Sequence, residues 1–249
     1  KRSRGAALLH AKAPAAMQRM AGRVAVVTGG AGGIGAAICR SLAREGARLV
    51  VAYNQGAERA ETLAKALPGT GHVAMQAAVD NSSSLRALAS RIQDGFGTVD
   101  LLVNNAGKTT PVPHSNMDDL HDDMFDDIMR TNVRGAFACT RALRGLLQGN
   151  GGGVVVNISS IAGTTGIGSN VAYCASKAAM NNMTIALGRA LAPDIRVVAV
   201  APGWVEGEYA KKADPAYLKD QLNKTPLGRL CQSEDVAETV IAVATSMPF

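Results

Sequence analysis

The sequence has no apolar run near the roughly 20 residues that a membrane-spanning helix needs. Its longest apolar stretches, such as Val24–Val27 and Val197–Ala201, have the length of buried strands. Apolar residues still make up 47% of the 249 residues, and charged residues only 18%. This balance supports one large buried core and predicts a single domain that does not span a membrane.

Aromatic residues are scarce, and so is net charge on the body of the chain. Aromatics make up 4% of the residues, which leaves few side chains for stacking on bases. Six of the 26 Lys and Arg residues lie within residues 1–23, which hold no acid, so 20 remain to balance 20 Asp and Glu. The net charge of +6 thus belongs to a tail, and we expect no nucleic-acid partner.

Disulfide and metal-binding patterns are also missing. No CxxC pair occurs among the cysteines, and no HExxH-like spacing among the histidines (Cys39, Cys139, Cys174, Cys231; His10, His72, His114, His121). We therefore expect a reduced, metal-free, cytoplasmic protein. Residues 1–22 are basic and match neither a secretory signal nor a complete transit peptide. We expect them to form an extension outside the fold, natural or added for expression, before a domain at 23–249.

From residue 23 onward, strand-like and helix-like segments alternate, and the strands are apolar throughout. Strands are expected at Val24–Thr28, Arg48–Tyr53, His72–Ala78, Val99–Asn104, Val154–Ser159 and Arg196–Ala201. Helices are expected at Ile34–Glu45, Ala57–Leu67, Ser83–Gly95, Met117–Leu147 and Ala172–Leu191. This rhythm predicts an α/β fold, a doubly wound, Rossmann-like parallel sheet covered on both faces by helices.

The first strand runs into a glycine-rich loop that opens the first helix, Thr28 to Gly35. Glycine allows a tight turn there and lets a pyrophosphate approach main-chain N–H groups at the positive end of the helix. Further on, Tyr173 and Lys177 are four residues apart, so on a helix they share one face. A nearby ammonium lowers the pKa of a phenol and makes it a usable proton donor and acceptor, while a hydroxyl such as Ser160 can polarise a carbonyl oxygen.

Together these features resemble the short-chain dehydrogenase/reductase family over roughly residues 23–249. The glycines follow its TGxxxGxG spacing, Asn104 to Gly107 reads NNAG, and Tyr173 to Lys177 reads YxxxK. Ser160 lies thirteen residues before Tyr173, and Pro202-Gly203 follows the sixth strand, as in that family. Asn132 stands where the family has its fourth catalytic residue.

The resemblance implies a sheet with strand order 3-2-1-4-5-6 and hydride transfer between a nicotinamide cofactor and a small-molecule carbonyl/alcohol pair. Tyr173 would be the general acid/base, Lys177 would lower its pKa and bind the nicotinamide ribose, Ser160 would orient the substrate oxygen, and Asn132 would support a proton relay. Cofactor contacts are implied at Gly29, Gly32, Gly33, Ile34, Gly35, Tyr53, Asn54, Asp80, Asn104, Ala106, Gly107, Tyr173, Lys177, Pro202, Gly203 and Val205. The family also implies a homotetramer or homodimer, and a further strand after Phe249 that this sequence lacks.

The end of the second strand decides the cofactor prediction. NAD-specific sites place an acid there to hold the ribose 2′-hydroxyl, whereas this chain has Tyr53, which does not repel a 2′-phosphate. The basic residue that often binds this phosphate is missing, because Gly32 and Asn54 occupy its usual places. Asn54, backbone N–H groups and Arg59 would have to hold the phosphate instead. NADP(H) is therefore favoured, with NAD(H) as the alternative.

Other functions fit the sequence less well. A non-catalytic nucleotide sensor on the same fold would tend to lose Tyr173 and Lys177. A serine hydrolase lacks its GxSxG motif here. A 3-oxoacyl thioester reductase stays open as the substrate class, although Asp194 stands near where such enzymes dock an acidic carrier through arginines. The six aspartates within Met117–Met129 fit a solvated helix face better than a calcium site, because EF-hand spacing is absent.

Overall fold

The computed structural model describes residues 18–207, 210 and 215–246. The strands are β1 (Val24–Thr28), β2 (Arg48–Tyr53), β3 (Val73–Gln76), β4 (Leu101–Asn104), β5 (Gly153–Ile158) and β6 (Ile195–Val200). The helices are α1 (Gly33–Arg44), α2 (Ala57–Ala66), α3 (Ser82–Phe96), the 3₁₀ turn η1 (Met117–Asp119), α4 (Asp122–Met129), the π-helical segment η2 (Arg130–Gly135), α5 (Ala136–Gln148), α6 (Ala162–Thr165), α7 (Val171–Leu191), α8 (Pro215–Lys224) and α9 (Ser233–Thr245).

The strands form one parallel sheet in the order β3-β2-β1-β4-β5-β6, which confirms the predicted topology. The order reverses beside β1, because the chain first winds towards β3 and then returns to add β4 on the other side. The carboxyl ends of β1 and β4 therefore lie next to each other, where ligands bind in folds of this kind.

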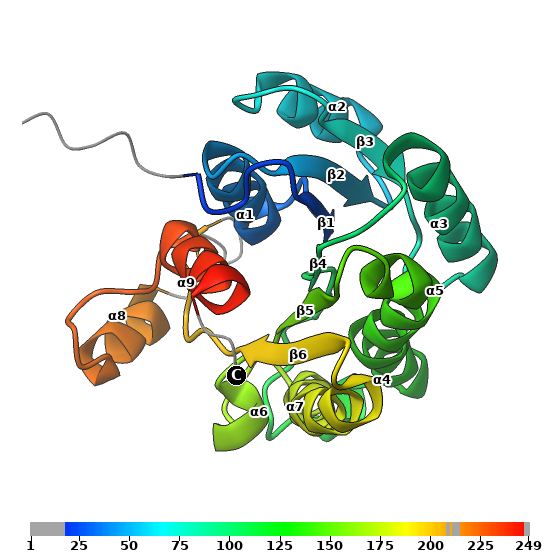
Figure 1. Ribbon diagram of the computed structural model, residues 1–249. Coiled ribbons are helices and arrows are strands. Elements are labelled where there is room, and N and C mark those ends of the chain that lie inside the picture. The colour runs from blue at the N-terminus through cyan, green and yellow to red at the C-terminus, as the bar shows by residue number, and fades with distance from the viewer. Residues whose placement is uncertain (1–17, 208–209, 211–214, 247–249) are drawn as a thin grey trace, which may run out of the picture.

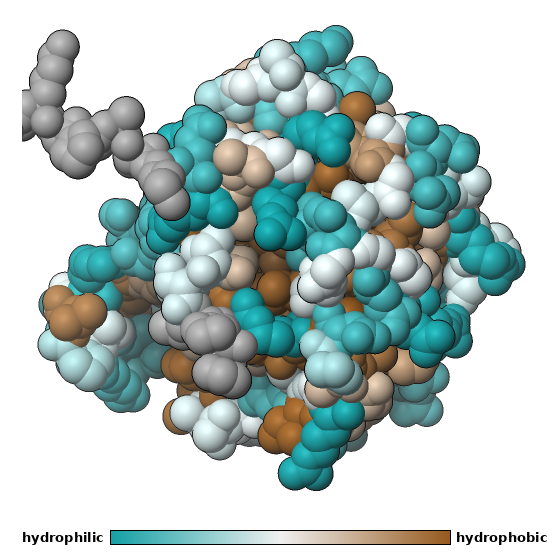
Figure 2. All heavy atoms as spheres, in the orientation of Figure 1, coloured by the Kyte–Doolittle hydropathy of each residue, from teal (hydrophilic) through white to brown (hydrophobic). Residues whose placement is uncertain are grey.

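Helices cover both faces of the sheet, as the uniformly apolar strands predict (Figure 1). One core joins the sheet to α1, α2 and α9, with Ile38 and Leu42 fully buried. The other joins it to α3 and α5, with Leu88 and Leu143 buried. In the face shown in Figure 2, hydrophilic residues dominate the outer helices and hydrophobic residues show between them towards the middle. None of the helices described here is both long and apolar enough to cross a membrane.

The expected helix from Met117 to Leu147 is wrong as a single element. The chain forms η1, leaves helical geometry around His121, and then continues as α4, η2 and α5. In η2, Gly135 packs closely on Val79, which lies three residues after β3. A Cβ on Gly135 would lie 2.8 Å from Val79 Cγ2. Sequence periodicity gives no sign of this contact with a distant segment.

The predicted start of the domain also needs correction, because residues 18–22 pack on the fold. Met20 is 5% exposed and belongs to the core beneath α1. Arg19 pairs with Glu45 at 2.8 Å, and Met20 N donates to the Glu45 carbonyl oxygen. The packed domain therefore begins before residue 23.

A chain of buried polar side chains, which we call the amide ladder, links β4 and β5 to the helices beside them. The Asn104 amide donates to Thr140 Oγ1 on α5 (3.2 Å) and to Asn157 Oδ1 on β5 (2.9 Å). Asn157 in turn donates to Thr184 Oγ1 on α7 at 2.9 Å. Asn104 and Asn157 are register partners in the sheet, so the ladder runs straight across these two strands.

Candidate active site

The glycine-rich loop lies at the carboxyl end of β1, and close packing explains two of its glycines. Gly29 adopts a left-handed φ of 61°. A Cβ on Gly35 would lie 2.4 Å from the Gly29 oxygen and 2.7 Å from Asn105 Nδ2, so no other residue fits there without movement. A Cβ on Gly33, by contrast, would meet nothing within 4 Å. The open space in front of Gly33 is where a ligand can approach the loop.

The loop is tied directly to the segment that follows β4. Thr28 Oγ1 accepts hydrogen bonds from the backbone N–H groups of Asn105 (3.1 Å) and Ala106 (3.0 Å). The Asn105 side chain donates back to the Thr28 and Gly29 carbonyls. Asn104, which was predicted to contact the cofactor, differs from Asn105 and Ala106 because its side chain is buried in the amide ladder. Asn104 therefore could meet a cofactor only through its backbone.

These residues fit a dinucleotide at the amino end of α1. Gly32 is the N-cap and supplies no side-chain hydrogen bond, so the first N–H groups of the helix, including those of Gly33 and Ile34, have no side-chain cap. Such N–H groups and the helix dipole bind phosphate. Tyr53 ends β2 and Asn54 is exposed beside it. Arg59 folds back over this turn, with Nη2 3.0 Å from where a Gly56 Cβ would be.

Asp80 lies after β3, half-buried, and is not a helix cap. The N-cap of α3 is Asn81, whose Oδ1 accepts from the N–H groups of Ser83 and Ser84. The Asp80 carboxylate lies 3.9 Å from Arg130 Nε, and its carbonyl accepts from Arg134. Asn81, rather than Asp80, therefore caps α3.

Ser160 follows β5, and the bonding of its hydroxyl differs from that of its neighbour. Ser159 Oγ donates towards α7, to Asn181 Oδ1 (2.6 Å) and the Lys177 carbonyl (3.2 Å). Ser160 Oγ accepts the N–H of Ala162 at 3.1 Å, which uses a lone pair and lets the hydroxyl hydrogen point elsewhere. Ser160 is thus the hydroxyl of this pair suited to donate to a substrate oxygen.

Tyr173 and Lys177 lie one turn apart on α7, with Lys177 Nζ 5.6 Å from the centre of the Tyr173 ring. Tyr173 is half-buried and Lys177 is 6% exposed. The ammonium donates to the neutral Ile158 carbonyl at 2.7 Å, and no carboxylate pairs with it among the residues that the structure describes. Burial lowers the pKa of Lys177 from 10.5 to about 8, so the group is still mostly charged at pH 7.

The segment after Ser160 folds against these two residues. A Cβ on Gly168 would lie 3.2 Å from Tyr173 Cδ1, and one on Gly163 would lie 2.5 Å from the Lys177 carbonyl carbon. These two glycines let the chain between Ser160 and α7 pack tightly on the helix. The structure therefore packs the segment that follows Ser160 against the turn of α7 that carries Tyr173 and Lys177.

Asn132 sits in the π-helical segment η2 and is fully buried. Its Oδ1 accepts from Lys108 N (2.8 Å), and its Nδ2 donates to the Lys108 carbonyl (3.0 Å) and to Ser176 Oγ (3.1 Å). Ser176 Oγ donates to the Tyr173 carbonyl. Asn132 is thus connected to the Tyr173 turn through Ser176, and its oxygen lies 3.3 Å from where a Gly107 Cβ would be. π-Helical insertions of this kind recur at functional sites.

The remaining predicted residues follow β6. The Pro202 carbonyl accepts from Ile161 N at 3.1 Å, and Gly203 faces the Ile161 side chain. Val205 pairs with Cys231 through an isolated parallel bridge, which anchors the start of the segment leading to α8. Pro202 and Gly203 therefore lie against the residue next to Ser160.

Sequence reasoning missed Asn170, the buried N-cap of α7, which binds the Tyr173 backbone N–H. The sequence did contain a signal for it, because Asn is a favoured N-cap residue and stands three residues before Tyr173.

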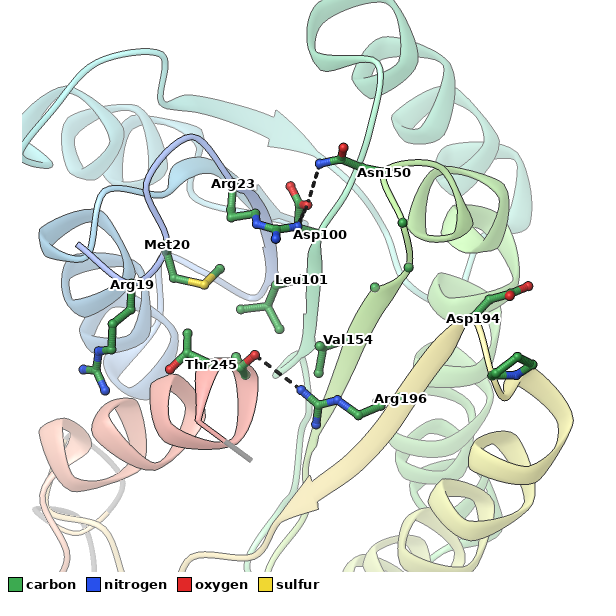
Figure 3. Close-up of a pocket in the computed structure, with 15 residues that line it drawn as sticks. Arg19, Met20, Arg23, Asp100, Leu101, Asn150, Val154, Asp194, Arg196 and Thr245 are labelled. Carbon is green, nitrogen blue, oxygen red and sulfur yellow. Dashed lines mark hydrogen bonds and ion pairs between the residues drawn. The ribbon is translucent and has the colours of Figure 1, made fainter. Parts of the chain in front are cut away.

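A cavity of about 450 Å³ opens at the opposite end of the sheet, at the amino ends of β1, β4, β5 and β6 (Figure 3). There Arg23 and Asn150 bind the Asp100 carboxylate, away from the glycine-rich loop. No three His, Cys, Asp or Glu side chains cluster as metal ligands within the described ranges.

Comparison with known proteins agrees with this geometry. The family model described as short chain dehydrogenase matches residues 23–217. A Streptomyces violaceoruber protein described as ketoacyl reductase 2 of granaticin polyketide synthase is 36% identical, over 88% of each chain. The 3alpha-hydroxysteroid dehydrogenase of Mediterraneibacter gnavus is 33% identical, over 90% of each chain.

A solved structure gives the same result for the fold. The crystal structure of a Burkholderia xenovorans protein described as a short-chain dehydrogenase/reductase superposes with a TM-score of 0.84. It is 33% identical, and the match covers 91% of this chain and 92% of that one. The sheet order, the family model and these relatives together show that the chain is an oxidoreductase and belongs to the short-chain dehydrogenase/reductase family.

Proposed function

We propose that this protein is an NADP(H)-dependent carbonyl reductase or alcohol dehydrogenase that uses Tyr173 as its general acid/base. The observation that carries the proposal is the buried Lys177 ammonium, which binds the neutral Ile158 carbonyl and lies 5.6 Å from the centre of the Tyr173 ring. A cation in that position stabilises the phenolate of a tyrosine whose unperturbed pKa is near 10. The uncapped glycine-rich loop at α1 supplies a dinucleotide site in the same chain.

Each residue then has a defined task. When bound, the nicotinamide supplies or accepts the hydride. Tyr173 gives a proton to the forming alkoxide, or takes one from an alcohol. Ser160 donates its hydroxyl hydrogen to the same substrate oxygen and holds it in place. Lys177 would hold the nicotinamide ribose, and Asn132 keeps the Lys108 carbonyl in position for a proton relay.

The cofactor preference rests on the turn after β2. Tyr53 and Asn54 bring no carboxylate against a 2′-phosphate, and the Arg59 guanidinium folds over the same turn. The test is kcat/KM for NADPH and NADH with one reducible ketone, together with Arg59→Ala. NADPH should be preferred, and Arg59→Ala should weaken NADPH more than NADH. A preference of more than about tenfold for NADH, or roughly 1.4 kcal/mol, would contradict the proposal.

The substrate is proposed only as a small carbonyl/alcohol pair. One relative is named as a ketoacyl reductase and another as a hydroxysteroid dehydrogenase, so 3-oxoacyl thioesters remain a second candidate class. Asp194 is exposed and accepts from Gln148, but it precedes the amino end of β6, at the opposite end of the sheet from the glycine-rich loop, so it argues neither for nor against this class. A panel of ketones, keto-sugars and acyl thioesters, followed by nicotinamide absorbance, separates these classes.

We further propose that the protein works as a homotetramer or homodimer in the cytoplasm. Large apolar side chains are exposed on α4, α5 and α7, among them Phe125, Phe137, Val171 and Ile185. A second copy of the chain would bury them. Light scattering that gives a stable monomer at micromolar concentration would contradict this assembly. The cysteines of the described chain are free, which is compatible with a reducing compartment.

A further inference from the structure

The first turn of α7 is held by one buried side chain. Asn170 has extended backbone angles (φ −168°, ψ 172°) and is 1% exposed. Its Oδ1 accepts the N–H of Tyr173 at 2.6 Å, so it caps the helix. Tyr173 is the third residue of α7, in the turn that frays first when such a cap is lost.

The other end of the same amide binds a different part of the chain. Asn170 Nδ2 donates to the Thr110 carbonyl at 2.6 Å and to Thr109 Oγ1 at 3.3 Å. The contact is reinforced by Ser169, whose carbonyl accepts from Val112 N at 2.9 Å. Asn170 therefore joins the Tyr173 turn to the segment that follows β4.

That segment is held from its other side by Asn132. Asn132 binds both the N–H and the carbonyl of Lys108, two residues before Thr110. Residues 108–110 are thus hydrogen-bonded by two buried asparagines, Asn132 from η2 and Asn170 from the start of α7. Asn132 also donates to Ser176 on α7, so both asparagines connect residues 108–110 to the same helix.

Lys177 is anchored in another way. It lies one turn further into α7, and its ammonium is bound to the Ile158 carbonyl of β5 rather than to residues 108–112. Loss of the Asn170 contacts would therefore move Tyr173 while Lys177 stayed in place. The relative position of the phenol and the ammonium depends on the cap.

We infer that Asn170 is a positioning residue that sets the place of Tyr173 relative to Lys177 by capping α7 and binding it to Thr110. The inference rests on the proposed function. It gives Asn170 a role in proton transfer, although its side chain touches Tyr173 only through the backbone.

The experiment compares Asn170→Ala and Asn170→Ser with a matched control, Asn81→Ala. Asn81 caps α3 by the same side-chain geometry but lies in another part of the fold and is exposed. Each variant is assayed for alcohol oxidation from pH 7 to 10.5, with the alcohol of the best ketone from the panel. Binding of NADPH is titrated by fluorescence, and folding is checked by circular dichroism.

For Asn170→Ala we expect kcat to fall at least about tenfold, since a misplacement of about 1 Å can cost on the order of 100-fold. The NADPH dissociation constant should change less than about threefold, or roughly 0.7 kcal/mol. The apparent pKa of kcat/KM should rise towards about 10, because the phenol loses its cation. Asn170→Ser keeps a capping oxygen, so its kcat and apparent pKa should lie between those of Asn170→Ala and the wild type. The other titratable groups near Tyr173 in the described chain, His114 and Cys174, are unchanged in every variant.

Asn81→Ala should leave kcat and the apparent pKa as in the wild type. If folded Asn170→Ala also keeps both, Asn170 is a structural cap only and the inference is wrong. If Asn170→Ala does not fold, Asn170→Ser decides: an intermediate kcat and a raised pKa support the inference, and wild-type values overturn it. A wild-type protein that neither binds NADPH nor turns over any member of the panel would instead refute the proposed function.

Discussion

Replacing Lys177 by methionine should stabilise the protein while removing its activity. The lysine is 6% exposed, and burial lowers its pKa from 10.5 to about 8. Keeping it charged in the folded state at pH 7 therefore costs roughly 3 kcal/mol relative to the unfolded chain. Methionine has a similar shape without the charge, but it leaves the Ile158 carbonyl without this donor, which costs about 1–2 kcal/mol. The net gain should be about 1–2 kcal/mol in the absence of cofactor.

The effect has a defined dependence on pH. Between pH 8 and 10.5 the folded protein releases the Lys177 proton while the unfolded chain keeps it, so wild-type stability rises with pH in this window. Lys177→Met lacks that rise, so its advantage should disappear near pH 9 and be reversed at pH 10. Urea unfolding at pH 7, 8, 9 and 10 measures this, with Lys65→Met as a control at an exposed lysine. A Lys177→Met protein that is less stable at pH 7, or a difference that stays constant across the series, would refute the reasoning.

Four further substitutions test the site and its support. Tyr173→Phe should lower kcat by about 10²–10⁴-fold with NADPH binding intact, and near-normal turnover would rule out the mechanism. Gly33→Ala has room for its Cβ and should fold at least as stably as the wild type while binding NADPH more weakly in a fluorescence titration. Gly35→Ala would meet the Gly29 oxygen at 2.4 Å and should lower stability by about 1–3 kcal/mol in urea; equal stability of both variants would contradict the packing argument. Asn157→Ala removes a partner of Asn104 and should cost about 1–3 kcal/mol, whereas an unchanged urea midpoint would show that the amide ladder contributes little.

Local patterns account for what the sequence could predict. The strands are short and uniformly apolar, so β1 and β2 appear with the expected bounds, and the sheet order follows from the family resemblance. The Tyr173–Lys177 spacing on one helix is also local. Contacts between distant segments were out of reach: Gly135 in η2 packs on Val79, and Asn170 binds Thr110, sixty residues away. Neither leaves a periodic signal in the sequence.

The amide ladder has a consequence for how the chain finds its active arrangement. Apolar strands such as β4 and β5 can be aligned in several ways with similar burial, because sliding one by two residues exchanges one valine for another. A slip of one residue would turn Asn157 to the opposite, apolar face of the sheet, and a slip of two would separate it from Asn104. Each such alignment leaves a buried amide without its hydrogen-bond partner. A misaligned sheet is therefore less stable even before any ligand binds.

The cost of misalignment concerns β4 and β5, the two strands that lead into the NNAG turn and Ser160. The NNAG turn begins at the last residue of β4 and Ser160 follows β5 by two residues, so a shift of one strand against the other would displace Ser160 relative to the NNAG turn by about 3.3 Å per residue. A protein trapped in that alignment would be compact but inactive. The buried hydrogen bonds of the ladder therefore favour the one alignment that places Ser160 beside the NNAG turn.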